Sequence, residues 1–225
     1  MLSPKRAKRS DSIHPFFEQY GQQLFGLGFI SWLAATVYVF LNFRGTYDAG
    51  DSISHYQFAA YAFEHPEHLL DHWAKPFFTL IAAPFAQFGF FGMKVFNSFM
   101  VLGTALVTWR IAGKQFFAVA GIAAVFVVCQ PEVFLAQFSG LTEPAFAFFL
   151  ALSLANVVEG ATRRGFIYAS FLPFIRTEGF LLLPVFAVWE LWRWWRSGEY
   201  QHTSFGNLVL RGSFLALGTA IYSLI

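Results

Sequence analysis

The chain has 225 residues, of which 56% are hydrophobic, 20% aromatic and only 12% charged, with a net charge of +2 and a mean hydropathy of +0.51. Because soluble domains average about 25% charged residues, this composition excludes an ordinary soluble domain and predicts an integral membrane protein. The expected surroundings are membrane lipids, with no nucleic acid as partner. The single cysteine, Cys129, stands in an apolar run, and we predict a buried core position for it.

The first predicted element is an apolar helix over residues 24–43, long enough to cross about 30 Å of hydrocarbon. It follows the basic stretch "PKRAKRS" and lacks a small-residue cleavage site, which predicts a retained anchor. By the positive-inside rule, residues 1–23 are cytoplasmic and a loop of about residues 44–76 is external. That loop carries more acids (Asp48, Asp51, Glu64, Glu67, Asp71) than bases (Arg44, Lys75).

Within this loop, residues 51–63 predict an amphipathic helix at the membrane surface, because apolar and aromatic side chains recur at helical spacing. Asp51 fits two compatible roles, the N-cap of that helix or a general base whose pKa is raised by partial desolvation. His65, His68 and His72 stand at i, i+3 and i+7. We place them on one helical face, either as polar interfacial residues or as metal ligands.

Residues 76–109 are too many for one perpendicular span. Pro84 and the pair Gly89 and Gly92 predict a short interfacial or re-entrant helix followed by a spanning helix over 94–109. Residues 116–128 then run outward to a second acidic loop. The next helix, with Thr142 as N-cap and Pro144 in its first turn, runs inward to about residue 158.

Residues 165–195 are basic at both ends, which predicts a hairpin broken at "LPFIRTEG", with one tilted helix as the alternative. The last apolar run, 208–225, has no polar tail, so we expect the N-terminal portion of a longer protein. The predicted fold class is all-α. Residues 24–225 form a polytopic transmembrane helical bundle whose large first external loop contains amphipathic interfacial helices. Its location is a cell membrane, the inner one in a bacterium, with a cytoplasmic N-terminus.

Several ionisable residues beside apolar runs are candidates for a site. Lys75 opens an apolar helix, where its ammonium either snorkels to the headgroups or meets a phosphate. Glu143 stands in a first helical turn, where the helix dipole stabilises it with or without a function. Arg176 and Glu178 lie between "FLPFI" and "FLLLP". There they either neutralise each other or Arg176 holds an anion.

Together these features resemble the GT-C superfamily of polyprenyl-phosphate-sugar-dependent glycosyltransferases, and most closely its protein mannosyltransferase and aminoarabinose transferase branch. The stretches "DSISHYQFAA", "AKPFF" and "LPFIRTEG" are similar to that branch's D-E-x-x-Y-x-x-x-A, K-P-P and R-P-E-G. The chain departs from these patterns at Ser52, Phe77 and Thr177.

The resemblance implies an enzyme that moves a sugar, with inversion, from a polyprenyl-phosphate donor to a hydroxyl of a glycan, lipid or protein acceptor at the external face. A divalent metal, Mg²⁺ or Mn²⁺, is compatible with it, because some relatives use one and others do not. A transporter or lipid-binding protein without transferase activity is the alternative. The implied residues are the catalytic Asp51, Glu143 and Asp48, the phosphate-binding Lys75 and Arg176, and the supporting His55, Tyr56 and Glu178.

Overall fold

The computed structural model describes residues 15–71, 73–115, 117–198 and 204–224, which form helices, turns and loops and no strand. The predicted all-α class is therefore confirmed for the described part of the chain. The elements in chain order are α1 (Pro15–Asn42), α2 (Asp51–Tyr61), η1 (Pro66–Leu69), α3 (Pro76–Ala86), α4 (Gly89–Gln115), α5 (Phe117–Cys129), α6 (Pro131–Ala136), α7 (Glu143–Val158), α8 (Thr162–Ser170), η2 (Leu172–Phe174), α9 (Gly179–Arg196), α10 (Phe205–Ser213), η4 (Phe214–Ala216) and α11 (Leu217–Tyr222).

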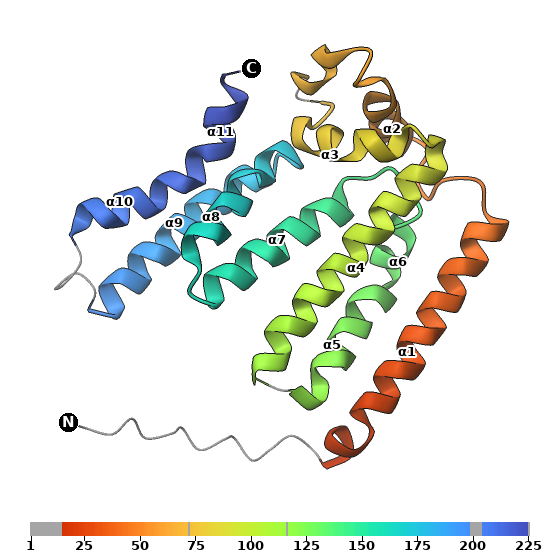
Figure 1. Cartoon of the computed structure of the whole chain (residues 1–225), viewed down its shortest axis with the longest axis horizontal. Helices are drawn as coiled ribbons and strands as arrows, with labels where there is room; N and C mark the ends of the chain where they lie inside the picture. The colour runs from red at the N-terminus through yellow and green to blue at the C-terminus, as the bar shows by residue number, and fades with distance from the viewer. Residues whose placement is uncertain (1–14, 72, 116, 199–203, 225) are drawn as a thin grey trace.

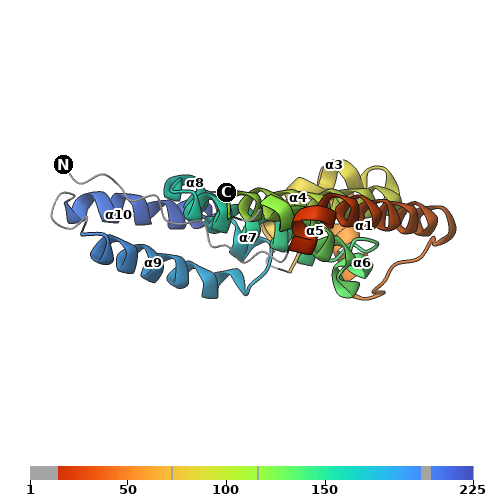
Figure 2. The same ribbon diagram turned by 90° about the horizontal axis from the view of Figure 1, so that it is seen from below.

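The long helices run between two ends of a flattened body (Figures 1 and 2). At one end, which we call the site end, α1 stops, α2 and α3 lie, and α7 and α9 begin. At the opposite end α4 leads into α5, and α7 leads into α8. Glu159, just after α7, forms ion pairs at this opposite end with Arg110 (3.0 Å) and Lys114 (2.9 Å) of α4. The fold thus separates the two acidic loops from the basic turns.

Among the described residues, two helical stretches are long and apolar enough to cross a membrane, residues 20–42 of α1 and 89–114 of α4. Three shorter stretches are also apolar: α3, residues 119–129 of α5, and α7. The expected division of residues 76–109 is confirmed, because α3 ends at Ala86 and α4 begins at Gly89.

Glycines explain how α3 and α4 meet so closely. Gly89 has φ +71°, a left-handed conformation that costs glycine little. A Cβ on Gly92 would lie 1.8 Å from the carbonyl oxygen of Phe85, so only glycine fits there. The buried rings of Phe78 and Phe96 then pack edge-on across the two helices, 5.8 Å apart. Burying a phenylalanine contributes about 1.5–3 kcal/mol, and this core supports the loops above it.

Small residues and one buried lysine attach α1 to the body. A Cβ on Gly28 would lie 2.5 Å from Val125, which shows how closely α1 approaches α5. At the other end of α1, the ammonium of the buried Lys94 donates to the carbonyl oxygen of Phe43 at 2.8 Å. This bond satisfies a carbonyl just beyond the helix end that has no intrahelical donor.

Residues 165–195 form the predicted hairpin, and the single tilted helix is wrong. The chain leaves α8, makes the turn η2, and begins α9 at Gly179. Phe166 and Phe186 lie on opposite sides of this break, yet their ring centroids are 6.2 Å apart, so α9 returns alongside α8. Gly179 permits the sharp return, since a Cβ there would lie 2.3 Å from the backbone of Leu172.

Two local predictions are wrong. Cys129 is exposed, because it ends α5 where the chain turns into α6. His65 does not share a helix with His68: α2 ends at Tyr61, and His65 adopts a non-helical φ/ψ of −126° and 74° before η1. The cause is Pro66, which disfavours helical geometry in the residue before it. The third histidine of that pattern, His72, lies outside the described residues.

Candidate functional site

Five titratable side chains predicted as site residues lie at the site end within range of one another's charges, and we call them the charged cluster: Asp51, His55, Lys75, Glu143 and Arg176. His55 is the central member, 6% exposed, with its ring against the edge of Phe78 at 5.7 Å. The charges of the other four residues all act on its pKa. Segments far apart in the sequence therefore come together around one imidazole.

Burial favours the neutral form of the His55 imidazole. Burial lowers its pKa below the ordinary 6.5, and the raising effect of Asp51 is smaller than this loss of solvation. Its Nδ1 atom is buried and has no hydrogen-bond partner within the described residues. A buried polar atom without a partner is costly, so it marks a position where a partner molecule would be stabilised.

Arg176 is held between two carboxylates. One end of its guanidinium pairs with Glu143, and Nη2 donates to Oε1 of Glu178 at 2.7 Å. Although burial lowers the pKa of Arg176, the hydrogen bond with Glu178 and the charge of Glu143 raise it overall, so the side chain is always a cation. The bond from Arg176 in turn holds the pKa of Glu178 below its usual value. The sequence left two roles open, mutual neutralisation of Arg176 and Glu178 or anion binding by Arg176. The structure shows the pairing of the two side chains.

Lys75 occupies a strained backbone position. Its φ of +57° is the only positive value of a non-glycine residue in the described part of the chain. Such left-handed geometry costs about 1–3 kcal/mol outside glycine and concentrates at functional sites. Pro76 follows it at the start of α3, and the Lys75 ammonium lies 5.9 Å from the centre of the Trp73 ring. The turn thus presents the lysine beside His55 and Glu178, whose pKa values both respond to its charge.

A buried seam holds the two acidic loops together and thereby positions Glu143. The hydroxyl of the fully buried Ser52 accepts from the backbone N–H of Gly140 at 2.6 Å and lies 2.6 Å from the hydroxyl of Thr46. Below it, Nδ2 of the fully buried Asn97 donates to the carbonyl oxygens of Ser139 and Leu141 at 2.8 and 3.0 Å. These bonds fix the turn that leads into α7.

The sequence identified neither partner of this seam. Ser52 was noted only as a departure from the family pattern, and Asn97 belongs to no motif. A side chain's hydrogen bonds to a distant loop leave no local signal, because they depend on how the helices pack.

The capping prediction for α2 needs correction. Gly50 occupies the N-cap position, and Asp51 is the first helical residue with its side chain exposed. The carboxylate that accepts from the first turn belongs to Asp48, whose Oδ2 lies 3.0 Å from the backbone nitrogen of Ser52. The carboxylate of Asp51 therefore does not cap α2, whereas the carboxylate of Asp48 stabilises the first turn of that helix.

Thr142 precedes α7 as predicted, and Pro144 stands in the first turn. The Thr142 hydroxyl makes no capping bond and instead lies 3.5 Å from Nη1 of Arg176, as an acceptor. The prediction of a helix start was right, while the side chain serves the charged cluster.

The remaining candidates lie beside the cluster or outside it. Tyr56 packs edge-on against Phe90 at 5.4 Å, in the core under α2. His65 pairs with Glu67 at 3.0 Å on the exposed surface, and the ring of His68 lies against Phe58. Within the described ranges no three His, Cys, Asp or Glu side chains form a group that could hold a metal ion. We therefore derive no step through a metal.

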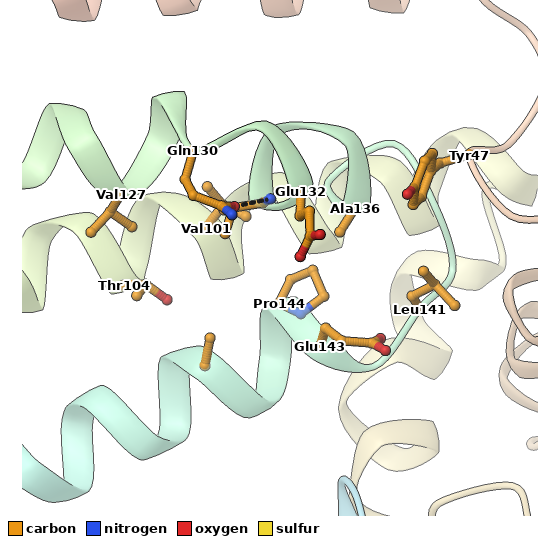
Figure 3. A pocket seen from close by; sticks show the side chains of 12 residues that line it. Tyr47, Val101, Thr104, Val127, Gln130, Glu132, Ala136, Leu141, Glu143 and Pro144 are labelled. Carbon is orange, nitrogen blue, oxygen red and sulfur yellow. Dashed lines mark hydrogen bonds between the residues drawn. The ribbon is translucent and has the colours of Figure 1, made fainter.

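Glu143 also borders a cavity of about 500 Å³ (Figure 3). Its walls come from α4, α5, α6 and α7, and Tyr47 stands at one end. The lining residues are Tyr47, Val101, Thr104, Val127, Gln130, Glu132, Val133, Ala136, Leu141, Glu143, Pro144 and Ala147. We call this cavity the groove.

Comparison with known proteins gives no match, whether with family models, curated sequences or solved structures. The resemblance to the GT-C superfamily stays a prediction from sequence motifs.

Proposed function

We propose that this protein is a multi-pass membrane glycosyltransferase of the GT-C type, which moves a sugar from a polyprenyl-phosphate donor to an acceptor hydroxyl with inversion. The observation that carries the proposal is the charged cluster, where cations and carboxylates from separate segments surround a buried histidine. Sugar transfer from a lipid phosphate needs both kinds of group. Cations stabilise the departing phosphate, and a base takes the proton of the attacking hydroxyl.

In this proposal the acceptor hydroxyl gives its proton to the carboxylate of Asp51, and its oxygen attacks the anomeric carbon from the face opposite the phosphate. The bond between that carbon and the phosphate oxygen breaks, and its electron pair leaves with the phosphate. Lys75 and Arg176 stabilise the charge that develops there. Fixed cations at a site partly shielded from water are among the largest contributors to such catalysis.

Arg176 links donor binding to the state of Glu143. Because the guanidinium already holds Glu143 and Glu178, an incoming phosphate has to replace one of them. Glu143 and Glu178 are about half exposed, so either can exchange partners at low cost. Replacement of Glu143 frees a carboxylate beside the groove, where it can orient the acceptor.

The proposed topology places the site end outside the membrane and the basic turns inside, in the sense of the positive-inside rule. The site end carries both acidic loops, whereas the opposite end carries Arg110, Lys114 and the Arg163–Arg164 pair. The four charged members of the cluster lie at or just before the start of a helix: Asp51, Lys75, Glu143 and Arg176. This favours a transferase over a transporter, because transporters bind their substrates near the bilayer midplane.

The test is transfer by the full-length protein in lipid nanodiscs, with undecaprenyl-phosphate mannose, glucose and aminoarabinose as donors and release of undecaprenyl phosphate as the readout. We expect Asp51→Asn to lower turnover at least about 100-fold, in line with the loss of a general base. Glu64→Gln, which removes an exposed acid of the same loop, serves as the control. Unchanged turnover of the stably inserted Asp51→Asn protein would sink the role of Asp51, and no turnover with any donor would sink the proposed donor class.

The resemblance is compatible with the use of Mg²⁺ or Mn²⁺ and with a reaction that needs neither ion. Repeating the assay after chelation with EDTA, and again after adding back each ion, measures any metal requirement directly.

A further inference from the structure

The groove is lined mainly by apolar side chains, with two glutamates at one end. Val101 and Thr104 of α4 line it from one side, with Val127 of α5 and Ala147 of α7 on either flank. Figure 3 shows Glu132 and Glu143 facing the same space, with Tyr47 beyond them. A volume of about 500 Å³ lies within the range of about 300–1,000 Å³ typical of small-molecule sites.

The charge of the groove determines which kind of lipid headgroup it can bind. Its lining residues include two carboxylates and no lysine, arginine or histidine. Glu132, exposed in the first turn of α6, has no ion-pair partner in the described part of the chain. A phosphate headgroup placed beside Glu132 would be repelled, whereas a head that donates hydrogen bonds to the carboxylates of Glu132 and Glu143 would be stabilised.

We propose that the groove binds the acceptor of the reaction, a single-chain amphiphile whose head carries hydroxyl or amine donors and no negative charge. The acceptor role rests on the proposed function, whereas binding to the groove does not. Glu143 then stands between two substrates of opposite character: the donor phosphate with Lys75 and Arg176, and the acceptor head with Glu132. The apolar tail of the acceptor lies along α4, between α5 and α7.

Binding is tested without any transfer reaction. The full chain in phosphatidylcholine nanodiscs is irradiated with two diazirine probes of equal chain length, octadecylamine and octadecyl phosphate, and the labelled residues are mapped by mass spectrometry. We expect the amine to label the segment from Val127 to Ala147 and the phosphate to label it far less. Glu132→Gln should lower labelling by the amine a few-fold, because one of the two attracting charges is gone.

Filling the groove provides the matched comparison. Ala147→Phe places a ring inside it, and we expect labelling to fall about tenfold, the scale of steric discrimination in an apolar pocket. Thr104→Phe fills the groove from the other helix, so the result does not depend on one variant folding. Ala187→Phe makes the same change on an exposed part of α9 and should leave labelling unchanged.

Two outcomes overturn the inference: equal or stronger labelling of the groove by octadecyl phosphate, or labelling that neither filling variant reduces. These outcomes are distinguishable from failure of the proposed function. Groove labelling without sugar transfer from any donor contradicts the transferase and leaves the binding site standing. Transfer with an unlabelled groove contradicts the groove and leaves the transferase standing.

Discussion

Helix α9 lies between two clusters of arginine and glutamate that differ in how much water reaches them. Near its end, Glu190 is 2% exposed and accepts from Arg193 at 2.8 Å through both carboxylate oxygens and from Arg211 of α10 at 3.2 Å. Before its start, Arg176 is shared by Glu143 and Glu178, which are 49% and 55% exposed. In the first cluster two cations surround one anion, and in the second two anions share one cation.

This difference separates a structural role from a functional one. Glu190 binds residues of its own helix and of α10, and its buried position leaves no approach for another molecule. Glu143 and Glu178 are about half exposed, and the buried Nδ1 atom of the neighbouring His55 has no hydrogen-bond partner within the described residues. The same residue types therefore hold two helices together at one end of α9 and, in the proposed function, form an exchangeable site at the other.

The largest effect is expected from breaking the buried cluster. Glu190→Ala leaves Arg193 and Arg211 without their shared carboxylate, and we expect it to lower the free energy of unfolding by about 3–5 kcal/mol. Reversible unfolding of the protein in mixed micelles measures this. Glu143→Gln in the exposed cluster should cost less than about 1 kcal/mol. Equal losses in the two variants would contradict the distinction.

Arg176→Met should show the reverse profile, a large loss of activity with little loss of stability. We expect turnover with the lipid-phosphate donor to fall about 100- to 1,000-fold, because one of two phosphate-stabilising cations is removed. Arg164→Met, which removes an exposed arginine at the opposite end, is the control. A variant that unfolds more easily but keeps its turnover would place Arg176 with the structural cluster instead.

The seam under Glu143 should give an intermediate effect on both quantities. Ser52→Ala removes the acceptor of the Gly140 N–H, and we expect about 1–3 kcal/mol of destabilisation for the buried donor left unpaired. Turnover should fall about tenfold as Glu143 shifts relative to α2. Ser54→Ala, on the same helix, removes a hydroxyl that donates to the carbonyl oxygen of the nearby Gly50 and should change neither. If Ser52→Ala and Ser54→Ala had the same stability and the same turnover, the proposed role of the seam in positioning Glu143 would be wrong.

The smallest effect is the pH dependence contributed by His55. Its pKa in the folded protein lies below the ordinary 6.5, so the unfolded chain binds more protons as the pH falls past that value. Stability is therefore present above 6.5 and is lost toward acid pH. In unfolding measured between about pH 8 and pH 5, His55→Gln should flatten this dependence, while the exposed His65→Gln should not. Identical slopes would show that His55 is solvated.

Most of the helical segmentation could be predicted from sequence, because its causes are local. Pro84, Gly89 and Gly92 mark the division between α3 and α4, and basic residues at both ends mark the α8–α9 hairpin. The prediction failed where a neighbouring residue decided the geometry. Pro66 disfavours helical geometry at His65, so His65 and His68 do not share a helix. Asp48, and not Asp51, accepts the hydrogen bond from the first turn of α2.

The site was predictable as a list of residues but not as an arrangement. Lys75, Glu143 and Arg176 stood out because ionisable groups beside apolar runs need a partner. Their convergence on His55 depends on the seam of Ser52 and Asn97, whose contacts join segments 42 or more positions apart. The burial of Glu190 likewise arises only when α10 packs against α9.

The left-handed turn at Lys75 sets stability against activity at a single residue. Glycine at this position would adopt φ +57° without strain and would stabilise the fold by about 1 kcal/mol or more. The same change would delete a cation that the proposed reaction uses. A search for stabilising substitutions guided by backbone geometry alone would therefore select the change most damaging to phosphate binding, and position 75 should be held fixed in any thermostabilised version of this protein.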